Sequence, residues 1–163
     1  MASSFILPLS DSAATDANRV GPKAANLAAL MRAGLPTPGG FCITADAYRR
    51  QIQHLELGDA IEAYPGADQP AQRRLAVEIR LKLYQSDLAP DLLAEILSAW
   101  WEEPKPAAVR SSALVEDRAG ANFAGQFESF LGVADDPTFL TALRACPRCG
   151  AGPPWSADSR PGP

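Results

Sequence analysis

The sequence contains few of the residues that most often perform chemistry or cross-link a chain. Among 163 residues there is one histidine, His54, and there are three cysteines. An odd and small number of cysteines does not build a disulfide framework and fits a reducing compartment. His54 has no nucleophile close to it in the sequence. We therefore predict that His54 is a solvated or half-buried helix residue.

Long apolar runs and an excess of positive charge are also missing. No segment approaches the roughly 18 apolar residues that a membrane helix needs. Met1 to Leu9 lacks a basic flank and is too short for a secretion signal. The formal net charge of −4 argues against nucleic acid as a partner. The sequence thus predicts a cytoplasmic chain with no membrane or nucleic-acid partner.

The remaining composition is that of a folded protein. With 47% hydrophobic and 21% charged residues, the chain is long enough to bury one core. Short strands and amphipathic helices alternate in the pattern, which favours an α+β fold. Strands are expected over 5–7, 40–43, 107–111 and 126–133. The first expected helix contains Leu27 and Met31 and ends at Gly34. Further helices are expected from Thr44 to about Gln53, over 71–85, from Pro90 to Pro104, and over 137–145.

Two of these elements allow side chains to be assigned to a face. The spacing of four apolar residues after Pro90 predicts the buried face of that helix: Leu93, Ile96, Leu97 and Trp100. Alternation between apolar and polar residues from Gln126 to Val133 is typical of a strand.

Arginine ends a short apolar run in the segment Ala108-Val109-Arg110-Ser111-Ser112-Ala113. A fixed guanidinium followed by hydroxyls and backbone amides is suited to phosphate oxygens. A solvated surface arginine remains the alternative. Farther along, we interpret Glu116 and Asp117 as a solvated pair of loop carboxylates.

A second informative segment lies near the N-terminus, where Lys23 follows Val20-Gly21-Pro22. Pro22 suits the first turn of a helix, because its missing N–H has no partner there anyway. The positive end of the helix dipole favours an anion, and a lysine adds a mobile positive charge.

Together the two segments resemble the N-terminal nucleotide-binding domain of the pyruvate phosphate dikinase and phosphoenolpyruvate synthase family. Rifampicin phosphotransferases look similar over the same region. The family pattern runs roughly G-G-K-G-x-N-L, A-G-L-P-V-P-x-G-F-x-x-T, V-R-S-S-A, E-D and F-A-G-Q. This chain follows it from about Val20 to Ala145, with an unmatched middle segment. The resemblance implies the first subdomain of an ATP-grasp domain, a small sheet with flanking helices.

The resemblance also implies roles for single residues. Lys23 and Arg110 would contact ATP phosphates, and Gly125 would let the backbone approach the nucleotide. Ser129 would offer a hydroxyl to phosphate or to metal-bound water, although a plain polar strand residue remains the alternative. The family's Mg²⁺ ligands, its phosphocarrier histidine and its pyruvate-binding barrel lie downstream. No metal ligand is therefore assigned in this chain, and His54 is not the phosphocarrier.

The sequence departs from the family pattern beside the lysine, where Pro22 and Ala24 replace glycines. Alanine resists backbone angles that glycine permits, and proline has no N–H to offer a phosphate. Leu114 also stands where the family often has threonine. These departures argue against tight ATP binding.

The last residues, 146–163, are rich in proline and glycine and predict neither helix nor strand. We expect residues 1–145 to be a partial ATP-binding domain and 146–163 a disordered tail read out of frame. Cys146 and Cys149 lie at the start of this tail without two further ligands nearby, so we assign them no metal or redox role.

The functional prediction is ATP binding in support of phosphoryl transfer to a histidine and then to pyruvate. As a fragment of an ATP-dependent dikinase, the chain is expected to lack full activity. Two alternatives remain open: a fragment similar to rifampicin phosphotransferase, and a non-catalytic nucleotide-binding or interaction module.

Overall fold

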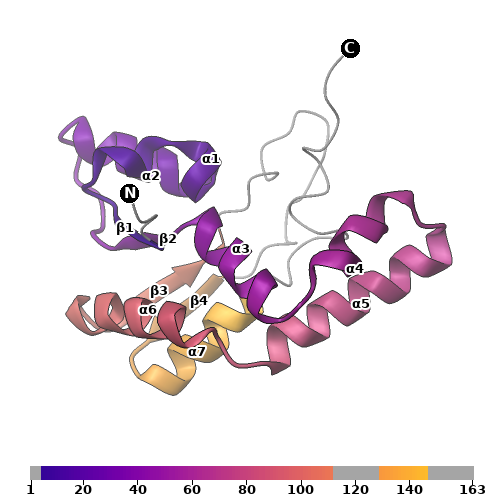
Figure 1. The fold of residues 1–163 in the computed structure, drawn as a ribbon. Coiled ribbons are helices and arrows are strands. Elements are labelled where there is room, and N and C mark those ends of the chain that lie inside the picture. The colour runs from indigo at the N-terminus through magenta and orange to yellow at the C-terminus, as the bar shows by residue number, and fades with distance from the viewer. Residues whose placement is uncertain (1–4, 112–128, 147–163) are drawn as a thin grey trace, which may run out of the picture. The chain divides into compact units, whose positions relative to one another are not determined.

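The computed structural model describes residues 5–111 and 129–146, which form two compact units (Figure 1). The first unit contains residues 5–51 and 88–104. The second contains residues 52–87, 105–111 and 129–146. Each unit therefore combines segments that are far apart in the sequence.

The first unit is built on a pair of short antiparallel strands. β1 pairs with β2 so that Ile6 lies opposite Ile43 and Pro8 opposite Phe41. The elements in chain order are β1 (Ile6–Pro8), the 3₁₀ helix η1 (Ser12–Thr15), α1 (Ala17–Val20), α2 (Pro22–Arg32), β2 (Phe41–Ile43), the start of α3 (Ala45–His54), and α6 (Pro90–Glu102).

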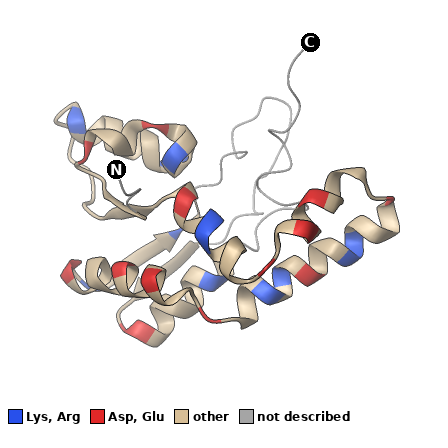
Figure 2. Ribbon diagram, viewed as in Figure 1, with Lys and Arg blue, Asp and Glu red and all other residues tan. Residues whose placement is uncertain are grey.

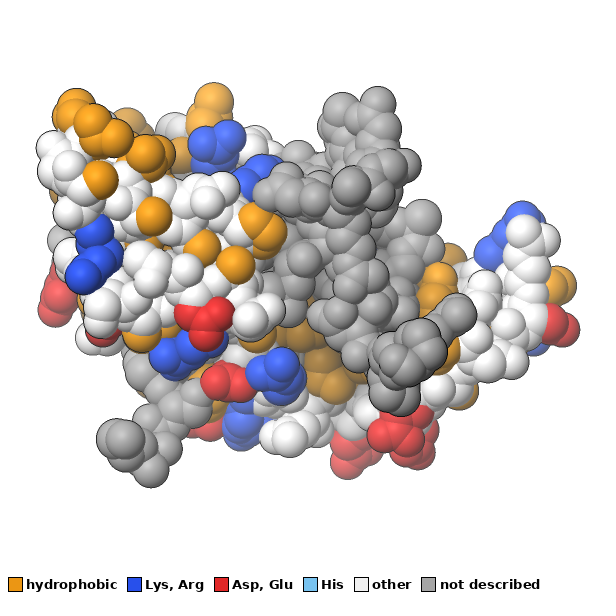
Figure 3. Space-filling model, turned by 90° about the horizontal axis from the view of Figure 1, so that it is seen from above, with side chains coloured by type: hydrophobic (Ala, Val, Ile, Leu, Met, Phe, Trp, Pro, Cys, Tyr) orange, Lys and Arg blue, Asp and Glu red, His pale blue; other side chains and the backbone are white. Residues whose placement is uncertain are grey.

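Both ends of α2 follow the sequence prediction. Pro22 is the first residue of the helix, and Gly34 ends it with a φ of 77°. The Gly34 N–H donates to the Met31 carbonyl at 3.0 Å, and the Leu35 N–H donates to the Leu30 carbonyl at 3.1 Å. These two bonds form a Schellman motif, which commonly brings together the apolar residues at the Leu30 and Leu35 positions. Both leucines remain exposed. Figure 3 shows hydrophobic side chains on the face of the first unit that is seen from above.

The core of this unit joins the strands to the first helices. Its buried members are Leu7, Leu9, Ala14, Val20, Ala25, Ala28 and Cys42. α6 is tied to β1 because the Ile6 N–H donates to Glu95 Oε1 at 3.0 Å. At the start of α6, the Ala89 N–H donates to Gln51 Oε1 at 2.9 Å, so the buried carboxamide satisfies a buried backbone group.

The buried face of α6 differs in part from the prediction. Ile96 and Trp100 are buried as expected, but the third buried residue is Leu92. Leu93 and Leu97 are only half-buried. Residues four apart form one ridge along a helix, and the buried ridge of α6 is Leu92, Ile96 and Trp100. The prediction instead combined part of this ridge with the neighbouring ridge of Leu93 and Leu97.

The second unit is a helical hairpin joined to a second strand pair. Its elements are the end of α3, α4 (Gly58–Ala63), the 3₁₀ helix η2 (Tyr64–Gly66), α5 (Gln69–Gln85), β3 (Ala107–Arg110), β4 (Ser129–Val133) and α7 (Asp136–Ala145). α4 and η2 pack against α5, while α7 packs against α5 and both strands.

Aspartates begin the two longer helices of this unit. Asp68 Oδ1 accepts the Ala71 N–H at 2.8 Å, and Asp135 Oδ1 accepts the Thr138 N–H at 2.8 Å. Such N-caps satisfy backbone donors that have no partner within the helix. The hydrogen bonds from Thr138 stabilise the carboxylate, so they hold the pKa of Asp135 below its ordinary value.

A bulge interrupts the alternation that predicted β4. Two steps along β3, from Ala107 to Val109, correspond to three steps along β4, from Val133 to Phe130. Gly132 in the bulge has a φ of 71°, which glycine adopts readily. As a result Val133 is buried, whereas Leu131 is 78% exposed.

The α+β class is confirmed, with one refinement. In the described ranges the strands form two separate two-stranded antiparallel sheets, rather than one small sheet flanked by helices. No helix within these ranges is long and apolar enough to cross a membrane.

Cys42 provides a test of the first core. Burial raises the pKa of its thiol to about 11, because the thiolate is poorly solvated inside the protein. Since the thiolate is the reactive form, iodoacetamide at pH 8 should modify native Cys42 roughly 100-fold more slowly than the unfolded chain. Peptide mapping by mass spectrometry with and without urea measures this. Equal rates in both states would show that Cys42 is not in a stable core.

Candidate functional site

Two of the predicted site residues lie directly opposite each other in the second unit. Arg110 ends β3, and its partner in the antiparallel register is Ser129, the first residue of β4. Residues opposite each other in such a pair point to the same face and have Cβ atoms about 5 Å apart. Both residues are exposed. The pairing thus puts a guanidinium and a hydroxyl on one accessible face.

The guanidinium of Arg110 is a group suited to an anionic ligand. Across residues 5–111 and 129–146, no ion pair involves this side chain. An arginine without a carboxylate partner keeps all its donors for a phosphate or carboxylate, which its planar fork can bind with two hydrogen bonds.

Ser111 adds a feature that the sequence analysis did not single out. Its Oγ is buried and has no hydrogen-bond partner in the part of the chain that the structure describes. Buried hydroxyls are nearly always satisfied by protein, water or a bound group. Its position directly after Arg110 in the V-R-S-S-A segment was the available signal.

Lys23 belongs to the first unit, where it is the exposed second residue of α2. The first turn of α2 contains no acidic residue. A cation there opposes the helix dipole and costs about 0.3–1 kcal/mol, which an anion bound at the same helix end would offset. The local electrostatics therefore favour an anion beside Lys23.

The backbone before Lys23 has a conformation that only glycine adopts easily. Gly21 has φ 81° and ψ 160°, and it both ends α1 and precedes α2. Its N–H donates to the Ala17 carbonyl at 2.9 Å, and its carbonyl accepts the Ala25 N–H at 3.0 Å. This one glycine thus sets the direction in which α2 and Lys23 leave α1.

Other residues named in the sequence analysis have simpler outcomes. Gly125, Glu116 and Asp117 lie outside the described residues. His54 is the exposed last residue of α3, which confirms the prediction of a surface position. Within the described ranges, no three His, Cys, Asp or Glu side chains are grouped as a metal site would require.

A comparison with known protein families identifies the relationship of the chain. Residues 17–149 match the family of the pyruvate phosphate dikinase AMP/ATP-binding domain. The chain belongs to this family. The match includes the segments of Lys23, Arg110 and Ser129, and it agrees with an α+β nucleotide-binding subdomain.

Relatives with several names are similar over most of this chain. A rifampicin phosphotransferase of Streptomyces sviceus is 35% identical over 87% of the chain and 17% of its own length. Phosphoenolpyruvate synthase of Aeropyrum pernix is 40% identical over 77% of the chain and 17% of its own length. A probable phosphoenolpyruvate synthase of Methanocaldococcus jannaschii is 33% identical over 87% of the chain and 13% of its own length. The chain therefore spans less than a fifth of these relatives.

The backbone conformation of Gly21 can be tested by giving this residue a methyl side chain. We expect Gly21→Ala to lower the free energy of unfolding by about 1–3 kcal/mol, because a side chain strains this φ and ψ combination. Urea denaturation at pH 7 measures the change.

The matched control is Gly58→Ala at the start of α4. An added Cβ there meets nothing within 4 Å, and alanine is the better helix former. Gly58→Ala should leave stability unchanged or raise it. If both variants unfold at the same urea concentration, the conformation described for Gly21 is incorrect.

Proposed function

We propose that this chain binds an adenine nucleotide through its phosphates, as part of a phosphoryl-transfer enzyme. The observation that carries the proposal is the pairing of Arg110 with Ser129 on one exposed face, within a chain that belongs to an AMP/ATP-binding family. Arg110 would hold phosphate oxygens through its guanidinium. Ser129 would donate a hydrogen bond from its hydroxyl to the same group.

Lys23 is proposed as a second phosphate contact. Its ammonium would act as a point charge at the positive end of the α2 dipole, where the nearby backbone also favours an anion. Pro22 has no N–H to donate there, so the ammonium must supply more of the attraction. Gly125 stays a proposed position of close backbone approach to the nucleotide.

Nucleotide binding, rather than turnover, is the function proposed for this chain. Phosphoryl transfer needs a positioned acceptor and, in most enzymes, Mg²⁺ that neutralises the developing charge. The described residues offer no group of three metal-ligating side chains. We propose that the chain alone binds the nucleotide without full activity.

Two acceptors are consistent with the relatives. A phosphoenolpyruvate synthase at 40% identity supports transfer to a histidine and then to pyruvate. A rifampicin phosphotransferase at 35% identity supports the second candidate, an antibiotic acceptor. Because both similarities cover the same nucleotide-binding region, an acceptor assay on a longer protein is needed to separate them.

The phosphate contacts can be tested by titrating the purified chain with ATP in a calorimeter. We expect Lys23→Ala and Arg110→Ala each to weaken binding about tenfold, since hydrogen bonds to charged groups contribute about 1.5–3 kcal/mol. Ser129→Ala should have a smaller effect, and Ser129→Thr should keep the affinity because it keeps the hydroxyl.

Arg32→Ala is the control for a general loss of positive charge. Arg32 is exposed in the last turn of α2, at the opposite end from Lys23. Adenosine, which has no phosphate, should bind equally to all variants. Unchanged ATP affinity in both Lys23→Ala and Arg110→Ala would refute the phosphate assignment and favour a non-catalytic interaction module.

A further inference from the structure

α5 carries a second apolar stripe, on the side that the fold does not bury. Ile79 and Leu83 are the buried residues of this helix. Three others are exposed hydrophobics: Val77 at 52%, Leu81 at 48% and Tyr84 at 37%. Their spacings of four and three residues place them on one face of the helix, over about two turns. This outer face is independent of the proposed nucleotide contacts.

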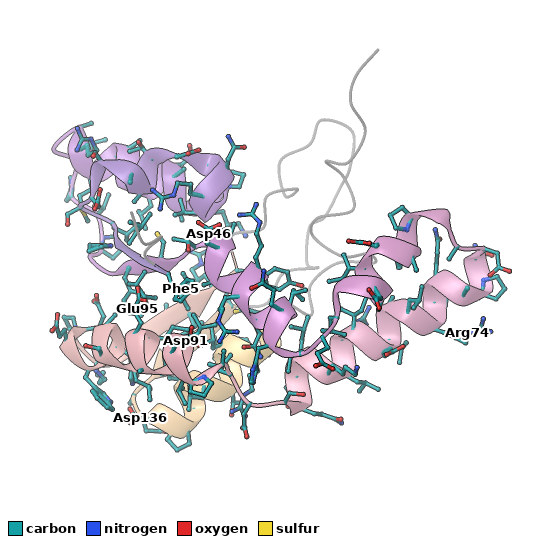
Figure 4. All side chains as sticks on the ribbon, in the orientation of Figure 1. Phe5, Asp46, Arg74, Asp91, Glu95 and Asp136 are labelled. Atoms are coloured by element: carbon teal, nitrogen blue, oxygen red, sulfur yellow. The ribbon has the colours of Figure 1, made fainter. Side chains whose placement is uncertain are left out.

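Arginines border the stripe on both sides. At 3.6 residues per turn, Arg73 and Arg80 lie within about 60° of Val77 on one side, and Arg74 lies about 60° away on the other. All three are exposed. Figure 4 shows Arg74 projecting from α5 on the side away from α4, and Figure 2 shows basic residues along the helix.

The charge of this helix is opposite to that of the whole chain. α5 has four basic residues and one acidic residue, whereas the chain has a net charge of −4. The single acidic residue, Glu78, already lies 3.7 Å from Lys82 in an ion pair. In the described parts of the chain, Arg73, Arg74 and Arg80 have no ion pair. Their guanidinium groups can therefore pair with the carboxylates of a binding partner.

The three arginines also bear on two other possible partners of this outer face, a second copy of the chain and a membrane. A symmetric contact between two copies of α5 would place arginines opposite arginines, which is unfavourable. An anionic membrane would match the charge, but binding to lipid scales with buried apolar area, and three side chains supply little. Helix packing needs only such a short ridge, because residues three and four apart on one helix fit the grooves of another.

We propose that the outer face of α5 is a docking site for an acidic amphipathic helix of a separate protein. Apolar side chains of that helix would pack on Val77 and Leu81, and its flanking carboxylates would pair with Arg73, Arg74 and Arg80. The contact is short, so the complex is weak and transient.

The probe is a synthetic helical peptide of about four turns, with leucines at helical spacing and glutamates on both flanks. A matched peptide has lysines in place of the glutamates. Fluorescence anisotropy of the labelled peptides is measured against the full chain at low and high salt. The acidic peptide should bind, the lysine peptide should not, and added salt should weaken the complex.

Two variants locate the binding. Leu81→Ser should weaken binding of the acidic peptide about tenfold, because it removes an apolar contact at the centre of the stripe. The triple charge reversal Arg73→Glu, Arg74→Glu and Arg80→Glu should exchange the preference, so that the lysine peptide binds instead. This gain of binding cannot come from unfolding.

The matched controls are Leu131→Ser and Arg32→Glu, which change exposed residues outside α5. Both should bind the acidic peptide like the unaltered chain. Four outcomes would overturn the proposal: no binding of the acidic peptide, equal binding of both peptides, an unchanged affinity in Leu81→Ser, or Leu81-dependent binding to phosphatidylserine vesicles or to a second copy. ATP affinity measured on the same variants should not change.

Discussion

The pairing of β3 with β4 is the contact on which the candidate site depends most directly. It joins two short segments that are separated in the sequence and places Arg110 opposite Ser129. α7 packs against both strands, and Val133 at the far end of the pair is buried. The apolar side of the pair therefore supports the exposed side. A substitution at Val133 or in α7 would therefore change the position of Arg110 through the strand pairing, although neither contacts a ligand.

The other proposed phosphate contact is built in a different way, from local helix geometry. Lys23 owes its position to the unusual backbone of Gly21 and to Pro22 at the first position of α2. The family's glycines next to the lysine would give backbone donors more freedom to approach a phosphate. Here a stiffer start to the helix takes their place. Both the family's glycines and the stiffer helix start leave the lysine charge at this position. They differ in how much of the attraction for a phosphate comes from backbone N–H groups and how much from the lysine side chain.

Several structural features were predictable because their causes are local. Gly34 ends α2 and Thr44 precedes α3, where Thr44 Oγ1 accepts the Ala47 N–H at 3.4 Å. Caps and prolines act within one turn of the chain, so neighbouring residues reveal them. The buried face of α6 was only partly predicted, because Leu92 and Leu93 have similar hydropathy. Which of them is buried depends on packing against a distant segment.

The sequence by itself determined the longer helices, the family and the residue types suited to phosphate, because periodicity, caps and ordered motifs depend on residues close together in the chain. The short helices α1 and α4 were not predicted. It identified Arg110 and Ser129 as separate candidates. Only the tertiary structure decided that they are cross-strand partners, that a bulge at Gly132 exposes Leu131, and that α5 has two apolar faces of which one is buried. The physical reason is that pairing register and burial depend on contacts between residues far apart in the chain, which no local pattern specifies.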